Sequence, residues 1–215
     1  MAFNRLSVLS LLASRSVIAY PSQNAQNQTI AWAPCPGLTE DILCGSLKVP
    51  LDYTNPTSSE TLELKMVKVA AVKAPKKGSI LFNPGGPGSG GRDMVADGKD
   101  GYHVISGGQY DLIGFDPRGT SDTLPINCFA SEQEENLFKN DFQSLPNETD
   151  TALGVYVAGT IVRADACYEN NKNTGDLLGT AFVARDMLQV VNALQEDGLL
   201  NFWGKSDPSI LLLAG

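Results

Sequence analysis

The stretch S-I-L-F-N-P-G-G-P-G-S-G-G, residues 79–91, decides the fold. Ile80 to Phe82 form an apolar run with the length of a buried strand, and this run leads directly into five glycines and two prolines. Glycine adopts backbone conformations closed to other residues, and it lets main-chain N–H groups face a ligand with no side chain between them. Residues 92–104 can follow as a helix. The sequence therefore predicts a strand, a glycine-rich loop and a helix.

A second apolar run, residues 110–115, is followed by Asp116-Pro117-Arg118-Gly119. Two buried strands joined through a helix are expected to run parallel, with a right-handed crossover. Upstream, residues 61–72 alternate apolar and polar side chains, which predicts a strand with one solvent-exposed face. Residues 47–53 predict an edge-like strand that stops at Pro50. The predicted fold class is α/β.

Downstream of these strands, residues 131–169 carry acidic helical pieces and predict an excursion from the sheet. Thr180 is expected to cap an amphipathic helix that ends before Gly198. One side of this helix is apolar and should belong to the core: Val183, Met187, Val190, Val191 and Leu194. Residues 199–203 predict a further short buried strand.

Length and charge limit the function classes. A chain of 215 residues suffices for one domain or two small ones. Its formal charge of −8 includes no cluster of Lys and Arg, which argues against binding to nucleic acid or to an anionic membrane surface. No stretch after the N-terminal segment reaches the length of a membrane span. The sequence gives no indication of an oligomeric state.

The N-terminal segment has the pattern of a secretory signal peptide. Arg5 precedes the apolar run Leu6 to Ala13, and small residues occupy both positions that determine cleavage after Ala19. We therefore expect a signal peptide over residues 1–19, a folded part over residues 20–204, and a divergent tail over residues 205–215.

Four cysteines and two glycosylation motifs agree with export. Four cysteines allow three pairings, and we expect the local one, Cys35 with Cys44 and Cys128 with Cys167. The motifs at Asn27 and Asn147 lie in polar, loop-like surroundings and predict a glycoprotein. Zinc is not expected, because the chain has no C-x-x-C motif and a single histidine.

Two nucleotide-binding interpretations of the glycine loop are weak. Gly86-x-Gly88-x-x-Gly91 fits the dinucleotide motif, but Pro84 and Pro87 remove N–H donors from the loop that should face the pyrophosphate. Gly204-Lys205-Ser206 has the ending of a P-loop, but Gly198 lies one residue too far upstream. We expect no cofactor.

A third interpretation is an oxyanion loop. In α/β-hydrolases one N–H donor to the developing oxyanion comes from the loop after an early strand. The second donor comes from the residue that follows a nucleophile on a later strand-to-helix turn. The order of motifs in this chain fits that plan.

Residues 83–88, N-P-G-G-P-G, resemble the Gly-Gly-Pro-Gly motif of the prolyl-iminopeptidase-like hydrolases, and in particular their secreted tripeptidyl-aminopeptidase branch. Three further segments resemble that branch in the expected order: Val49–Tyr53, Gly114–Gly119 and Leu200–Gly204. The resemblance covers most of the chain from Trp32 to Gly204. It implies the N-terminal part of an α/β-hydrolase fold, and a secreted serine peptidase that releases short N-terminal pieces from peptide substrates.

The resemblance also implies roles for individual residues. Gly85 and Gly86 would belong to the oxyanion loop, and Asp116 and Arg118 would brace the neighbouring turn. An ion pair that only holds a loop is an equally good interpretation of Asp116 and Arg118. His103 precedes the nucleophile position by about a hundred residues, whereas the hydrolase order is nucleophile, acid, histidine, so we expect a surface or helix-end residue.

The resemblance stops at Gly204. Ser206 falls at the nucleophile position, but Pro208 replaces the second glycine of the G-x-S-x-G turn. No acid and histidine of a triad follow, so we expect these 215 residues to be a truncated, inactive form. Trp-Gly-Lys-Ser can be encoded with the stretch GTAAGT, the form of an intron donor, so residues 205–215 are hypothesised to be translated intron sequence. The alternatives are a truncated paralogue that serves as a binding or regulatory module, or a dinucleotide-binding protein.

Overall fold

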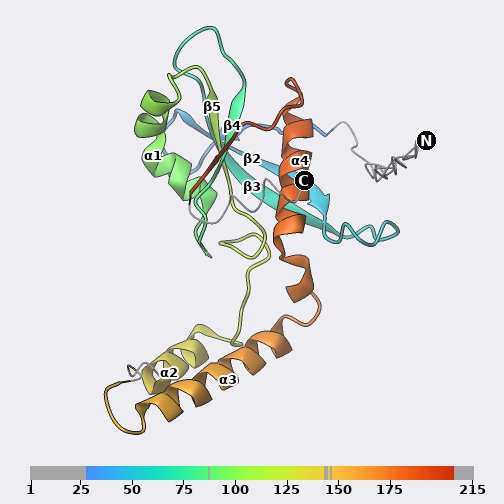
Figure 1. The fold of residues 1–215 in the computed structure, drawn as a ribbon. Coiled ribbons are helices and arrows are strands. Elements are labelled where there is room, and N and C mark those ends of the chain that lie inside the picture. Colours follow the sequence, from blue (N-terminus) through green and yellow to red (C-terminus); the bar gives the residue numbers. More distant parts are fainter. Residues whose placement is uncertain (1–27, 87, 143–144, 146, 206–215) are drawn as a thin grey trace, which may run out of the picture.

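A computed structural model describes residues 28–86, 88–142, 145 and 147–205, and its centre is a sheet of six strands (Figure 1). The strands are β1 (Ala33–Pro34), β2 (Ile42–Pro50), β3 (Thr61–Val69), β4 (Ser79–Asn83), β5 (Asp111–Phe115) and β6 (Phe202–Gly204). Their order across the sheet is β1-β2-β3-β5-β4-β6. β4 runs parallel to both β5 and β6, which confirms the predicted parallel pair, and the remaining pairs are antiparallel.

Helices cover both faces of the sheet (Figure 1). On one face α4 (Thr180–Leu194) packs on a core that includes Leu64, Leu81 and Phe115. On the other face α1 (Gly91–Ile105) places Val95 in a second core with Phe82, Leu112 and others. The apolar stripe predicted on α4 is buried, apart from Leu194, which is partly buried against the same core.

β2 ends at Pro50 as predicted, and because β1 pairs only with Leu43 and Cys44, the part of β2 from Leu47 onward has no outer neighbour among the described strands. Two other local predictions were wrong in detail. Thr180 is the first residue of α4 rather than its cap, and the cap position is Gly179, which has no capping side chain. β6 covers residues 202–204 and is partly exposed rather than buried, because among the described strands it pairs only with β4.

The predicted excursion after β5 is a helical hairpin, which we call the arm. It consists of α2 (Glu132–Phe142) and α3 (Ala152–Asn170), and it projects away from the sheet (Figure 1). A short helix, Gly175–Leu177, leads from the arm into α4. Both expected disulfides are present: Cys128–Cys167 ties the chain entering the arm to the last turns of α3, and Cys35–Cys44 ties the β1 region to β2. Within the described residues no helix has the length and apolar character that a membrane crossing needs.

A fully buried arginine joins the elements around β5. Arg118 follows β5, and its side chain forms a two-pronged ion pair with Asp186 of α4, at 2.8 Å from Nε to Oδ2 and 2.7 Å from the second N–H group to Oδ1. Both side chains have no solvent exposure. The other donors of the guanidinium bind three backbone carbonyls, those of Leu51 (2.8 Å), Leu177 (2.9 Å) and Pro50 (3.2 Å). Every N–H group of the guanidinium therefore has a hydrogen-bond acceptor.

Two aromatic rings complete this cluster. The guanidinium of Arg118 lies 5.1 Å from the ring centre of Phe182 and 5.5 Å from that of Tyr53. The Tyr53 hydroxyl donates a hydrogen bond of 2.8 Å to Asp186. Burial raises the pKa of Tyr53, and the Asp186 carboxylate raises it further, so the hydroxyl keeps the proton that it donates. Burial also raises the pKa of Asp186, while Arg118 and Tyr53 act in the opposite direction.

A close contact between two glycines brings α1 onto the sheet. A Cβ atom added at Gly91 would lie 2.1 Å from the carbonyl oxygen of Phe115, and one added at Gly114 would lie 2.3 Å from the carbonyl oxygen of Gly91. No side chain fits between these backbones, so α1 can begin directly against the end of β5 only with glycine at both positions.

We predict that Asp186→Ala lowers the free energy of unfolding by about 3–5 kcal/mol, because it leaves the Arg118 charge buried without a partner. Urea unfolding followed by tryptophan fluorescence measures the change. The double variant Arg118→Met, Asp186→Leu should lose much less, since neither charge then remains in the core. Glu135→Gln breaks the exposed ion pair with Lys139 and should cost no more than about 0.5 kcal/mol. An Asp186→Ala protein as stable as the Glu135→Gln protein would contradict the prediction.

We predict that Gly91→Ala destabilises the protein by roughly 1–3 kcal/mol or more, because the added methyl group overlaps the Phe115 carbonyl. Gly101→Ala is the matched control in the same helix, since no atom lies within 4 Å of a Cβ added there. That control should leave the stability unchanged or raise it slightly, because alanine is the better helix former. Equal thermal unfolding midpoints for the two variants would disprove the proposed close contact.

Candidate active site

Three parallel strands end side by side at one edge of the sheet. β4 leads into the glycine loop, β5 into the turn Asp116–Gly119, and β6 into Gly204 and Lys205. Gly204 pairs with Asn83, and the Lys205 N–H donates a hydrogen bond of 3.1 Å to the Asn83 carbonyl. In open sheets of this kind ligands bind outside the carboxyl ends of parallel strands. This edge is therefore the candidate active site.

The glycine loop has the conformation that only glycine adopts readily. Gly85, Gly86 and Gly88 have φ values of 74°, 142° and 97°. A Cβ atom added at Gly86 would lie 2.8 Å from the amide nitrogen of Gly88 and 3.3 Å from that of Ser89. The backbone amides of the loop thus lie close together, with no side chain among them.

The two glycines of the expected oxyanion loop differ in their hydrogen bonds. The Gly85 N–H donates to the side-chain oxygen of Asn83 at 2.8 Å, which fixes the start of the loop. Asn83 is almost fully buried at the end of β4. No described residue accepts a hydrogen bond from the Gly86 N–H, so within this part of the chain Gly86 is the glycine of the pair whose amide can serve a ligand.

Asp116 fixes the other end of the glycine loop. Its carboxylate, 1% exposed, accepts a hydrogen bond of 3.1 Å from the backbone N–H of Arg92 and one of 2.5 Å from the Arg92 side chain. Gly90 precedes α1 and has no side chain with which to cap it, so Asp116, the residue after β5, accepts the Arg92 N–H in its place. Although partial burial acts to lower the pKa of Arg92, the hydrogen bond to Asp116 raises it, and the pKa of Arg92 is raised as a result.

Asp116 and Arg118 do not form the ion pair that the sequence allowed. Asp116 continues the alternation of β5 and faces Arg92 of α1, whereas Arg118 lies beyond the turn at Pro117 and reaches Asp186 of α4. The two side chains therefore have partners on opposite faces of the sheet. Both hold the turn that follows β5.

Sequence analysis missed Asp186 and Arg92, the two partners. Asp186 carried a signal: it lies between Val183 and Val190 on the buried side of α4, and a carboxylate on an apolar stripe needs a buried partner. Arg92 carried no such signal, because an arginine in the first turn of a helix is ordinarily a surface residue.

His103 is buried, not at the surface as one expectation had it. It lies in the last turn of α1 with 9% of its surface exposed, and neither ring nitrogen has a hydrogen-bond partner among the described residues. About 18 Å of helix separate it from Gly91, where α1 leaves the candidate site. His103 is therefore remote from the glycine loop.

Several predicted residues lie outside the described part of the chain: Ser206, Asn27 and the whole signal peptide. Asn147 is described and exposed. The described residues form no group of three or more His, Cys, Asp or Glu side chains that could hold a metal ion.

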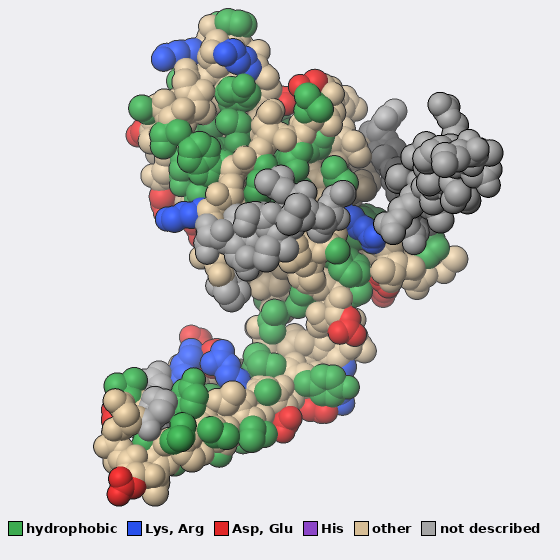
Figure 2. Space-filling view, in the orientation of Figure 1, with side chains coloured by type: hydrophobic (Ala, Val, Ile, Leu, Met, Phe, Trp, Pro, Cys, Tyr) green, Lys and Arg blue, Asp and Glu red, His purple; other side chains and the backbone are tan. Residues whose placement is uncertain are grey.

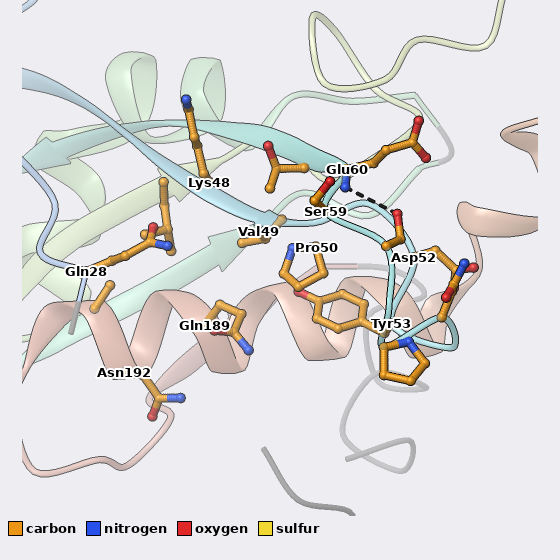
Figure 3. Close-up of a pocket in the computed structure, with 16 residues that line it drawn as sticks. Gln28, Lys48, Val49, Pro50, Asp52, Tyr53, Ser59, Glu60, Gln189 and Asn192 are labelled. Carbon is orange, nitrogen blue, oxygen red and sulfur yellow. Dashed lines mark hydrogen bonds between the residues drawn. The ribbon is translucent and has the colours of Figure 1, made fainter. Parts of the chain in front are cut away.

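A cavity of about 360 Å³ lies elsewhere, between α4 and the end of β2 (Figure 3). Tyr53, Pro50 and Gln189 line it, with polar side chains such as Glu60 and Asn192 around them. No residue of the glycine loop lines this cavity. The candidate active site is therefore distinct from it.

Comparison with known proteins finds no matching family model. A tripeptidyl aminopeptidase of Streptomyces lividans is 29% identical over 195 residues, which are 87% of this chain and 35% of that protein. The serine protease Hip1 of Mycobacterium tuberculosis is 28% identical over 188 residues, 80% of this chain and 34% of that protein. A carboxylesterase B of the same species is 31% identical over 156 residues, 70% of this chain and 28% of that protein.

The chain spans about a third of the length of the curated relatives that it matches. The mixed six-stranded sheet with helices on both faces fits an α/β-hydrolase fold. By sequence the chain is thus similar to a tripeptidyl aminopeptidase, a serine protease and a carboxylesterase, which is consistent with an α/β-hydrolase-like family.

Proposed function

We propose that the glycine loop serves a serine hydrolase that releases short peptides from the N-termini of peptide substrates. The observation that carries this proposal is the Gly86 amide, which faces no described acceptor at an edge where β4 and β6 end together. The relatives named tripeptidyl aminopeptidase and serine protease support a peptide substrate. The release of peptides from the N-terminus in particular is the more specific part of the proposal.

The proposed chemistry uses that edge directly. A serine at position 206, one residue after Lys205, would attack the scissile carbonyl carbon as its hydroxyl proton passes to a general base. The carbonyl oxygen then takes up the electron pair of the C=O bond, and the Gly86 N–H would stabilise this oxyanion. One such donor contributes on the order of 3 kcal/mol to the transition state.

The general base is not among these 215 residues in this proposal. His103 is the single histidine of the chain, and it is buried near the far end of α1. The residues described here therefore supply the oxyanion loop and the strand that leads to the nucleophile. The histidine and its acid would come from a further part of the gene product.

The test uses the longest secreted product of the gene, assayed for peptide release. We predict that it reacts with a fluorophosphonate probe at the serine after β6 and releases tripeptides from substrates with a free N-terminus. Gly86→Ala should lower kcat on the order of 100-fold, because the methyl group would crowd the loop amides.

Gly88→Ala is the matched control, since its φ is also positive but its Cβ would meet no atom within 4 Å. It should retain most of the activity. A loss in Gly86→Ala alone would then come from the crowded loop amides and not from backbone strain at a positive φ. The 215-residue chain alone should not react with the probe. Hydrolysis of esters without peptide release would replace the peptidase proposal with an esterase, and saturable NAD binding without probe labelling would overturn both.

We also propose that the protein is exported, with residues 1–19 removed as a signal peptide and residues 205–215 as a tail whose sequence diverges from the hydrolases. The two disulfides are compatible with an oxidising compartment. Mass mapping of secreted, unreduced protein should find Tyr20 at the N-terminus and both local cysteine pairs intact. Retention inside the cell with four free thiols would contradict export.

A further inference from the structure

The loop at the far end of the arm, between α2 and α3, contains the sequence Asn147-Glu148-Thr149. All three residues are exposed, and Asn147 lies in a turn. In that turn the Glu148 N–H donates a hydrogen bond of 3.1 Å to the Leu145 carbonyl. The loop is the part of the arm farthest from the sheet (Figure 1). Figure 2 shows the arm extending clear of the rest of the molecule, so Asn147 is presented to solvent.

The side chain of Asn147 differs from those of the asparagines at the base of the arm. There the side-chain nitrogens of Asn170 and Asn171 each donate hydrogen bonds of 2.8–3.0 Å to two backbone carbonyls. Both nitrogens are therefore committed to holding the arm together. No described residue forms a hydrogen bond with the side chain of Asn147, so its nitrogen is free to react.

A second exposed asparagine provides an internal comparison. Asn55-Pro56-Thr57 lies in the loop between β2 and β3, and Thr57 donates to the Asn55 side-chain oxygen from its hydroxyl (2.8 Å) and from its N–H (3.3 Å). Pro56 fixes its own φ and restricts the backbone of the residue before it. N-linked glycosylation requires N-x-S/T in which x is not proline. Among the described asparagines only Asn147 meets this requirement.

We propose that Asn147 carries an N-linked oligosaccharide. The donor is an oligosaccharide linked to a lipid pyrophosphate, and a transferase of the secretory pathway delivers it. The side-chain nitrogen of Asn147 forms a bond to the anomeric carbon of the first sugar. The bond from that carbon to the pyrophosphate oxygen breaks, the oxygen keeps the electron pair, and the nitrogen loses one proton to a base. The proposal rests on the proposed export and is independent of the hydrolase chemistry.

A glycan at this position determines which part of the arm stays in solvent. An oligosaccharide is bulky and strongly hydrated, so the end of the arm that carries it cannot pack against a further part of the gene product. The candidate active site lies at the edge of the sheet, at a distance from this loop (Figure 1). The glycan therefore leaves the glycine loop and the end of β6 open.

Mass mapping of the secreted protein from a eukaryotic host tests the proposal. Peptide-N-glycosidase in heavy-oxygen water converts each glycosylated asparagine to a labelled aspartate, and we predict this label at Asn147. Asn147→Gln and Thr149→Ala should each remove one glycan from the electrophoretic pattern, whereas Thr149→Ser should keep it, because serine also satisfies the motif. Glu148→Pro should remove the glycan as well, although it leaves the asparagine and the threonine in place.

Pro56→Ala is the matched control, because it completes the motif at Asn55 in another exposed loop. That variant should gain one glycan. Protein that stays inside the cell serves equally well for the mapping, since the transfer precedes secretion. Unlabelled Asn147 in protein whose disulfides have formed would overturn the glycan proposal alone. Unlabelled Asn147 together with four free thiols would overturn both the glycan and the proposed export.

Discussion

The buried ion pair of Arg118 and Asp186 is the interaction on which the arrangement of the sheet and α4 depends. Removing two charges from water costs several kcal/mol for each ion, and the cost is offset only when every donor and acceptor is satisfied. Arg118 meets this condition through Asp186 and three carbonyls, which belong to the end of β2 and to the short helix before α4. Segments that are far apart in the sequence must therefore adopt their positions together. The turn after β5 is fixed as a result.

The glycine loop depends on that turn, because the turn contains Asp116, which lies two residues before Arg118. Asn83 binds the first amide of the loop, and Asp116 binds the backbone at the start of α1. Between these two anchors the chain crosses the edge of the sheet with glycines at the positions where side chains would collide. Backbone donors held in this way need no reorganisation when charge develops on a ligand, which is the condition for effective oxyanion stabilisation.

The elements that local pattern determines could be predicted from the sequence. The parallel pair β4 and β5, the buried side of α4 and both cysteine pairs follow from apolar periodicity and spacing. Predictions that depended on distant partners did less well. Arg118 and Asp186 are 68 residues apart, and no local pattern indicates which acid an arginine will meet. β6 was expected to be buried because its side chains are apolar, but burial depends on neighbouring strands, and the described residues supply one on a single side.

The arm and the sheet show two ways in which apolar side chains are used. In the sheet the alternation of β3 sends Leu64 toward α4 and Val67 toward α1, so each face finds a helix of the same chain. Among the described helices and strands α3 packs beside α2, and a pair of helices can bury no more than one face of each. The disulfide Cys128–Cys167 holds the arm together at its base without covering the other face. The apolar side chains that α3 leaves exposed, such as Leu153 and Ile161, therefore contribute little to the stability of the described part of the chain.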